Sequence, residues 1–167
     1  MTILLFYLAA FVAVIATSLV ITRTNAVHAL IYLIVSLLAT GFVFLLLGAY
    51  FAALLEVIVY AGAVMVLFLF VLMMLGLGRD GEGRERELLQ PHLWYGPAFL
   101  CGVLLGEWGI LFLGWSQPFP LHAVDAKQVG ISLLGPYFLA VELASMLLLA
   151  GLVGAYHLTE LQRRPGA

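Results

Sequence analysis

The sequence has few charged residues and only one cysteine. Charged residues make up 10% of its 167 residues and hydrophobic residues 65%, whereas soluble domains contain about 25% and roughly 45–50%. A soluble protein of this length could not bury so much apolar surface, so the solvent of this chain must be lipid. The lone Cys101 excludes an internal disulfide and any metal site built from several cysteines.

Motifs of several other functional classes are also missing. The net charge of −2 and the absence of a basic patch give no sign of nucleic-acid binding. The sequence contains no phosphate loop, no dinucleotide fingerprint and no nucleophile–base arrangement. Its four histidines are scattered, without the spacing of metal ligands. We therefore expect no catalytic residue, no metal site and no cofactor bound by this chain itself.

Long apolar segments fill most of the chain and predict an all-α polytopic membrane protein. A helix needs about 20 apolar residues to cross a bilayer. The N-terminal segment has no positive leading region and is too long for a signal core, so we interpret it as a retained first span. The prediction is a single transmembrane domain over residues 1–167. Its five spans cover about residues 2–22, 26–48, 51–77, 94–115 and 134–158, with solvated loops at 78–92 and 116–131.

Basic residues are distributed unevenly between the two ends of the predicted spans. Five spans place the termini on opposite sides of the membrane. The end that includes the C-terminus carries Arg23, Arg79, Arg84, Arg86, Arg163 and Arg164, and the other end carries only Lys127. Because cytoplasmic loops are enriched in Lys and Arg, we expect the N-terminus outside and the C-terminus in the cytoplasm.

Three acidic residues, Glu56, Glu107 and Glu142, lie inside predicted spans. A charge at the bilayer centre costs about 2.5–3.5 kcal/mol. No Lys or Arg is predicted within a span, so each carboxyl must be neutral, hydrated or paired with a neighbouring subunit. We expect Glu107, next to Trp108, to reach the outer interface. Structural and functional roles stay equally open for Glu142, whereas we favour a function for Glu56.

The start of the third span is more polar and has smaller side chains than a plain anchor requires. Glu56 and Tyr60 are four residues apart and would share a face of an α-helix. The phenol could donate to the carboxylate or hold a water beside it, which makes the pair a candidate proton relay. The following Ala61, Gly62 and Ala63 would let another helix approach. Gly62 also lowers the cost of a π-bulge, although spacing alone favours ordinary helix packing as its explanation.

Several segments of this chain resemble one family. They are Thr24-Asn25-Ala26-Val27-His28-Ala29-Leu30, Gly48-Ala49-Tyr50-Phe51, VIVYAGAVMVLFLFVLMML and, near the C-terminus, YFLAVELASMLLLAGLVGAYHL. The family is the J subunit (chain 6 in mitochondria) of proton-translocating NADH:quinone oxidoreductase, respiratory complex I. The resemblance covers residues 24–76 and 130–159.

The resemblance implies a non-catalytic, five-helix membrane subunit of this oxidoreductase and translocase. Its partners would be the quinone-cavity subunit, the small three-helix subunit, the antiporter-like subunits and the lipid bilayer. NADH, FMN, iron–sulfur clusters and quinone would be bound by partner subunits. The excess of Arg over Lys favours a bacterial plasma membrane over the mitochondrial inner membrane.

The resemblance also implies roles for particular residues. Rotation at a π-bulge in the third span would make or break a water chain that links quinone reduction to proton pumping. The hinge residues would be Tyr60, Ala61, Gly62 and Ala63, and the proton-transfer residues Glu56, Tyr60 and Glu142. Two alternatives stay open: a membrane subunit of a multi-subunit cation/proton antiporter, and a purely structural helix-packing scaffold.

Overall fold

The computed structural model describes residues 2–74, 91–113 and 124–163, and their regular structure is entirely helical. Five of the described helical segments are long and apolar enough to cross a membrane, which confirms the predicted number of spans. They are Ile3–Thr22, Ala26–Leu46, Tyr50–Met74, Trp94–Leu113 and Phe138–Thr159. The predicted span ends at 75–77 and 114–115, and the loop residues 78–90 and 116–123, lie outside the described residues.

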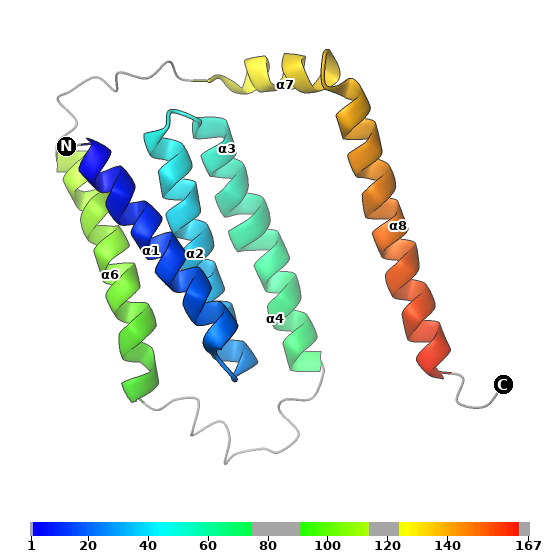
Figure 1. Ribbon diagram of the computed structural model, residues 1–167, viewed down its shortest axis with the longest axis horizontal. Coiled ribbons are helices and arrows are strands. Elements are labelled where there is room, and N and C mark those ends of the chain that lie inside the picture. The colour runs from blue at the N-terminus through cyan, green and yellow to red at the C-terminus, as the bar shows by residue number, and fades with distance from the viewer. Residues whose placement is uncertain (1, 75–90, 114–123, 164–167) are drawn as a thin grey trace. The chain divides into compact units, whose positions relative to one another are not determined.

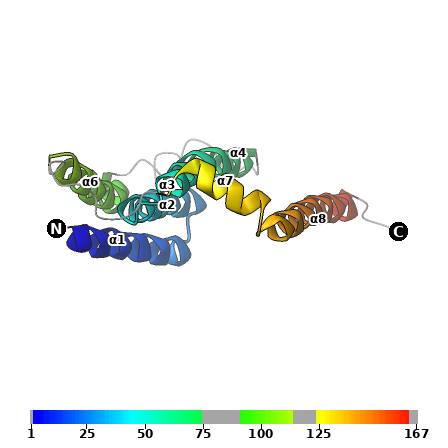
Figure 2. The same ribbon diagram turned by 90° about the horizontal axis from the view of Figure 1, so that it is seen from above.

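The chain divides into two compact units, Met1–Ala123 and Val124–Ala167. Helix α2 lies at the centre of the first unit and contacts each of the other helices of that unit (Figures 1 and 2). The helices of this unit are α1 (Thr2–Thr22), α2 (Ala26–Leu46), α3 (Tyr50–Leu55), the π-helix η1 (Glu56–Val64), α4 (Met65–Met74) and α6 (Pro91–Leu113). Helix α6 includes residues 91 and 92, which the sequence analysis placed in a loop.

Two short turns separate the first three spans, as the sequence predicts. The Asn25 side chain accepts a hydrogen bond of 3.0 Å from the Val27 N–H and so caps α2. Between α2 and α3, Gly48 has a φ of 80°, a backbone conformation that other residues rarely adopt. These local signals therefore determine where α2 begins and where it ends.

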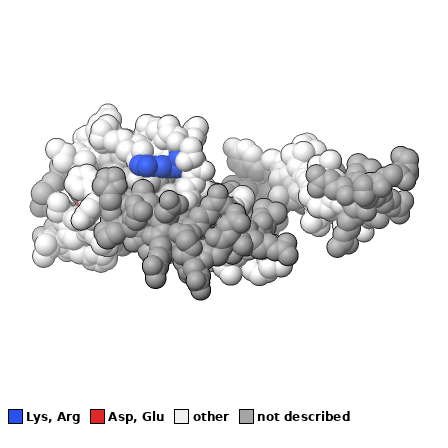
Figure 3. Space-filling model, turned by 90° about the horizontal axis from the view of Figure 1, so that it is seen from below, with Lys and Arg blue, Asp and Glu red and all other residues white. Residues whose placement is uncertain are grey.

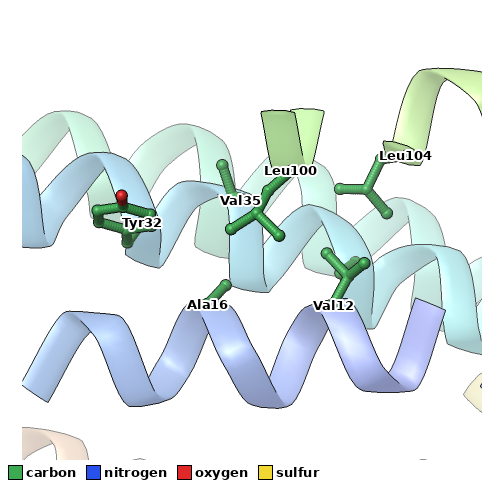
Figure 4. Close-up of a cluster of buried hydrophobic side chains, with 7 residues drawn as sticks. Val12, Ala16, Tyr32, Val35, Leu100 and Leu104 are labelled. Atoms are coloured by element: carbon green, nitrogen blue, oxygen red, sulfur yellow. The ribbon is translucent and has the colours of Figure 1, made fainter. Parts of the chain in front are cut away.

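The core of the first unit lies where α1, α2 and α6 meet. Ala9, Ala16 and Ala39 are completely buried there, because small side chains let membrane helices approach closely. Figure 4 shows Val12 and Ala16 of α1 pointing toward α2. One buried cluster contains Val12, Ala16, Tyr32, Val35, Ala39, Leu100 and Leu104, and a second contains Leu5, Ala9, Phe42 and Leu46.

Few charges appear on the described surface. Figure 3 shows one small patch of basic atoms on the face that it views. The Arg23 guanidinium lies 5.3 Å from the centre of the Tyr32 ring, a distance at which a cation is attracted to the ring face. The interaction joins the connection after α1 to the buried part of α2.

The second unit differs from the prediction at its start. It contains α7 (Ala126–Leu134) and α8 (Phe138–Arg163), with a turn at 135–137 between them. The prediction of a loop up to residue 131 was therefore wrong for residues 126–131. The prolines that suggested a loop are Pro118 and Pro120, whereas residues 126–134 contain no proline and place Val129 and Leu133 at helical spacing.

Candidate functional site

The third span changes its helical geometry in the middle. It is α-helical in α3, becomes a nine-residue π-helix over Glu56–Val64, and returns to α-helix in α4. At the end of η1 the Met65 N–H donates to the carbonyls of Gly62 and Tyr60, three and five residues earlier. Such i to i+5 geometry is rare and is found frequently at functional sites. The predicted bulge, Tyr60 to Gly62, lies inside this π-helix.

Gly62 suits this geometry because of a contact within the helix. A Cβ atom added at Gly62 would lie 3.3 Å from the carbonyl oxygen of Val57, again five residues earlier. That separation is tighter than nine in ten real Cβ contacts, so the carbonyl would have to shift by a few tenths of an ångström. Glycine at this position therefore permits the wide turn that a larger residue would disfavour.

The π-helix is held at its ends and open along its middle. Ala53 in α3 and Met65 in α4 are buried, whereas no residue of η1 is buried. Tyr60 is 53% exposed within this chain. The middle of the third span is therefore not covered by the other described helices of the first unit.

Glu56 and Tyr60 both lie on η1, but no hydrogen bond joins them in the part of the chain that the structure describes. Glu56 is half-buried and Tyr60 is exposed. The shared face was predicted for an α-helix, and the i to i+5 pattern of a π-helix puts more residues into each turn. The relay between these two side chains stays a prediction.

Glu142 lies on α8, in the second unit. Its side chain is exposed within that unit, and its backbone carbonyl accepts a hydrogen bond of 2.7 Å from the Ser145 hydroxyl. This hydrogen bond involves the backbone carbonyl oxygen of Glu142 and not its side-chain carboxylate. A proton-transfer role for Glu142 therefore also stays a prediction.

Glu107 does not reach the outer interface, so the prediction for this residue was wrong. It is 1% exposed, and neither carboxylate oxygen has a hydrogen-bond partner among the described residues. The reason is its register on α6. Leu100, Leu104 and Leu111 recur at helical spacing and pack into the two buried clusters. Glu107 belongs to the same stripe, a signal already present in the sequence.

Replacing Glu107 with Leu is expected to strengthen the docking of α6 by about 1–2 kcal/mol, because an unsatisfied buried polar group costs about that much. A leucine would continue the apolar stripe at a similar volume. The measurement is the temperature at which the purified complex loses this subunit. Glu107→Gln, which keeps a polar group, is the control and should gain less. A lower dissociation temperature for Glu107→Leu would show that the carboxyl has a stabilising partner.

An apolar groove adjoins the start of the third span. Its volume is 540 Å³, and its walls come from α2, the α3–η1 junction and α6. Tyr50, Val57 and Trp108 are among the lining residues, and none of the lining residues is acidic or basic. Across the described residues, no group of three or more His, Cys, Asp or Glu side chains could hold a metal ion. The groove can therefore accept an apolar group but offers no charged ligand to a polar cofactor.

The fold and this site define a helical, multi-span membrane protein with a π-helix in its third span. The family model for NADH-ubiquinone/plastoquinone oxidoreductase chain 6 matches residues 16–158. The chain therefore belongs to the chain 6 family of NADH-quinone oxidoreductase subunits, an assignment that agrees with the predicted resemblance.

Similar bacterial proteins agree with this family. Subunit J of NADH-quinone oxidoreductase from Escherichia coli strain K12 is 55% identical over 159 residues, which cover 95% of this chain and 86% of the relative. The subunit J from Pseudomonas aeruginosa is 58% identical over 155 residues, 92% of this chain and 93% of the relative. The subunit J from Buchnera aphidicola subsp. Baizongia pistaciae is 35% identical over 161 residues, which cover 95% of this chain and 98% of the relative.

Proposed function

We propose that this chain couples quinone reduction to proton translocation in a proton-pumping NADH-quinone oxidoreductase, with η1 as the gating element. The observation that carries the proposal is the π-helix itself, which lies within a membrane span and contains Glu56, Tyr60 and Gly62. π-Helices are rare and occur mostly as single-turn bulges inside α-helices. The two forms of the third span can therefore be close in free energy, as a two-state gate requires.

Conversion between the two forms would rotate one half of the span against the other. Each residue of an α-helix turns the chain by about 100°, so taking one residue out of the wide π turn rotates everything beyond it by that amount. The side chains of α4 would then present a different face to the neighbouring subunits. Such a rotation would let an apolar side chain replace a polar one beside a water chain, and so interrupt it.

The proton-transfer groups of the proposal are Glu56, Tyr60 and, on the last span, Glu142. The Tyr60 phenol and the Glu56 carboxylate would hold water at the gate. With the N-terminus outside and the C-terminus in the cytoplasm, the third span runs inward and Glu56 lies near its outer end. The chain would be a multi-pass protein of the bacterial inner membrane.

The other parts of the reaction belong to partner chains in this proposal. NADH, FMN, iron–sulfur clusters and quinone would be held by other subunits, and this chain would supply no catalytic residue. The proposed neighbours are the quinone-cavity subunit, the small three-helix subunit and the antiporter-like subunits. The middle of η1 supports this arrangement, because none of its residues is buried by the described helices of the first unit.

Tyr60→Phe tests the proposal directly. Losing one hydrogen bond to ordered water costs about 0.5–1.5 kcal/mol, so proton pumping and quinone reduction should fall about two- to tenfold. Both rates are measured in proteoliposomes, after a native gel stained for NADH oxidation has shown that the complex assembles. Tyr7→Phe is the control, because Tyr7 is also exposed but lies in the regular helix α1. Normal pumping in the Tyr60→Phe enzyme would favour a purely structural scaffold.

A further inference from the structure

We infer that Gly41 of α2 is a positioning residue that sets the start of η1 by seating the side chain of Val57. The inference rests on the proposed gating function of η1 and goes beyond it, because it names the contact that holds one end of the gate. Gly41 lies on a different helix from the residues that the resemblance suggests.

Gly41 lies at a close approach between α2 and the third span. A Cβ atom added at Gly41 would lie 3.3 Å from Val57 Cγ2, 3.6 Å from the carbonyl oxygen of Ala53 and 3.7 Å from Glu56 Cγ. Ala53 belongs to α3, whereas Glu56 and Val57 are the first two residues of η1. The contact therefore falls at the transition from α- to π-helix.

Gly96 of α6 also meets a neighbouring helix, at Tyr32, whereas three further glycines of α6 make no such contact. A Cβ atom added at Gly102, Gly106 or Gly109 on α6 would have no atom of the described residues within 4 Å, apart from its own helix backbone and chain neighbours. Gly41 is also buried, beside the fully buried Phe42. The small size of residue 41 is therefore required by a specific neighbour and not by helix packing in general.

Val57 is placed between two glycines. Its side chain faces Gly41 of α2, while its carbonyl oxygen faces Gly62 of the same π-helix. The interhelical contact and the wide π turn thus meet at one residue. Because they use different atoms of Val57, substitutions can separate them.

This arrangement divides the third span into a held part and a free part. Ala53 is buried, and the first residues of η1 lie against α2. Val57 itself is 40% exposed, and Ile58, next along η1, is 64% exposed. The contact between Gly41 and Val57 therefore holds the start of the π-helix against α2. A π-to-α conversion would then rotate the residues beyond Val57 and leave α3 in place.

A methyl group added at residue 41 would push Val57 away from α2 and shift the start of the π-helix. We expect Gly41→Ala to lower the number of protons pumped per electron about fivefold, a modest overpacking effect. Assembly, measured as NADH–ferricyanide activity on a native gel, should be kept. Gly102→Ala is the matched control, because it adds the same methyl group where no atom of this chain lies close.

Removal of the Val57 methyl groups should reverse this effect. We expect Gly41→Ala combined with Val57→Ala to regain pumping close to that of the unmodified enzyme. Val57→Ala should not restore pumping to a Gly62→Ala enzyme, because the alanine keeps the carbonyl oxygen that faces residue 62. This difference between the two double variants would not arise from a general loss of stability.

The outcomes separate this inference from the proposed function. Normal pumping in Gly41→Ala, or no rescue of that variant by Val57→Ala, overturns the role of Gly41. Reduced pumping in Gly62→Ala would still support the gating function of η1. Normal pumping in both glycine variants would overturn the gating proposal and the role of Gly41 together.

If Gly41→Ala does not assemble, Val57→Ala alone serves as the test. It leaves a gap at the seat and should lower pumping about twofold, and normal pumping there would also overturn the role of Gly41.

Discussion

A Gly62→Leu enzyme is expected to assemble and to oxidise NADH, but to pump protons about tenfold more slowly or worse. The expectation follows from the turn between Val57 and Gly62. Any Cβ atom at residue 62 would lie 3.3 Å from the Val57 carbonyl oxygen, and overpacking of this kind costs about 1–3 kcal/mol. Each 1.36 kcal/mol corresponds to tenfold in rate.

Leucine at residue 62 would also favour a third span that is α-helical throughout. It is a better α-helix former than glycine by about 0.8 kcal/mol. Both effects act in the same direction and move the third span toward continuous α-helix. A gate that must visit both forms would then be trapped in one of them.

The measurement compares proton pumping with electron transfer in the same proteoliposomes. Gly102→Leu is the matched control, because it makes the same substitution at an exposed glycine of the regular helix α6, where no described atom lies within 4 Å of an added Cβ atom. We expect the control to pump at more than half the normal rate. An assembled Gly62→Leu enzyme with normal protons per electron would contradict the gating proposal.

Gly96→Ala is expected to reduce the amount of assembled enzyme about tenfold, by weakening the docking of α6 on α2. The Tyr32 hydroxyl occupies the space that a Cβ atom at Gly96 would need. Tyr32 is 2% exposed, and its ring is held between the buried cluster and the Arg23 guanidinium. The ring therefore cannot move aside without unpacking its neighbours, and overpacking costs about 1–3 kcal/mol.

The test is the yield of intact complex on a native gel. Tyr32→Phe removes the hydroxyl that blocks residue 96 and should restore part of the yield in the Gly96→Ala background. Gly102→Ala, on the same helix, should assemble normally because nothing lies close to that position. Equal yields from Gly96→Ala and Gly102→Ala would mean that Tyr32 has room to move.

Local signals explain why much of the fold could be predicted. The length and hydropathy of each apolar segment depend only on neighbouring residues, and so do the Asn25 cap and the turn at Gly48. The prediction failed at residues 126–131, because proline and charge before α7 outweighed its helical pattern. It failed again at Glu107, where nearness to Trp108 outweighed the stripe of leucines.

The candidate site was predictable in position but not in detail. The small residues after Tyr60 indicated where the helix could widen, and the resemblance to the family indicated the same place. The extent of the π-helix, from Glu56 to Val64, could not be read from spacing, because i to i+5 hydrogen bonds leave no separate sequence pattern. The roles of Glu56, Tyr60 and Glu142 in proton transfer stay predictions that the substitutions above address.

The sequence by itself determined the solvent, the number of spans and the family, because each of these depends on composition or on runs of neighbouring residues. Only the tertiary structure decided that Glu107 is buried and that Gly41 meets Val57. The physical reason is that both depend on the rotation and separation of helices distant in sequence. The small residues and the family resemblance therefore indicated where the third span could widen, but the contact at the start of the π-helix comes from α2.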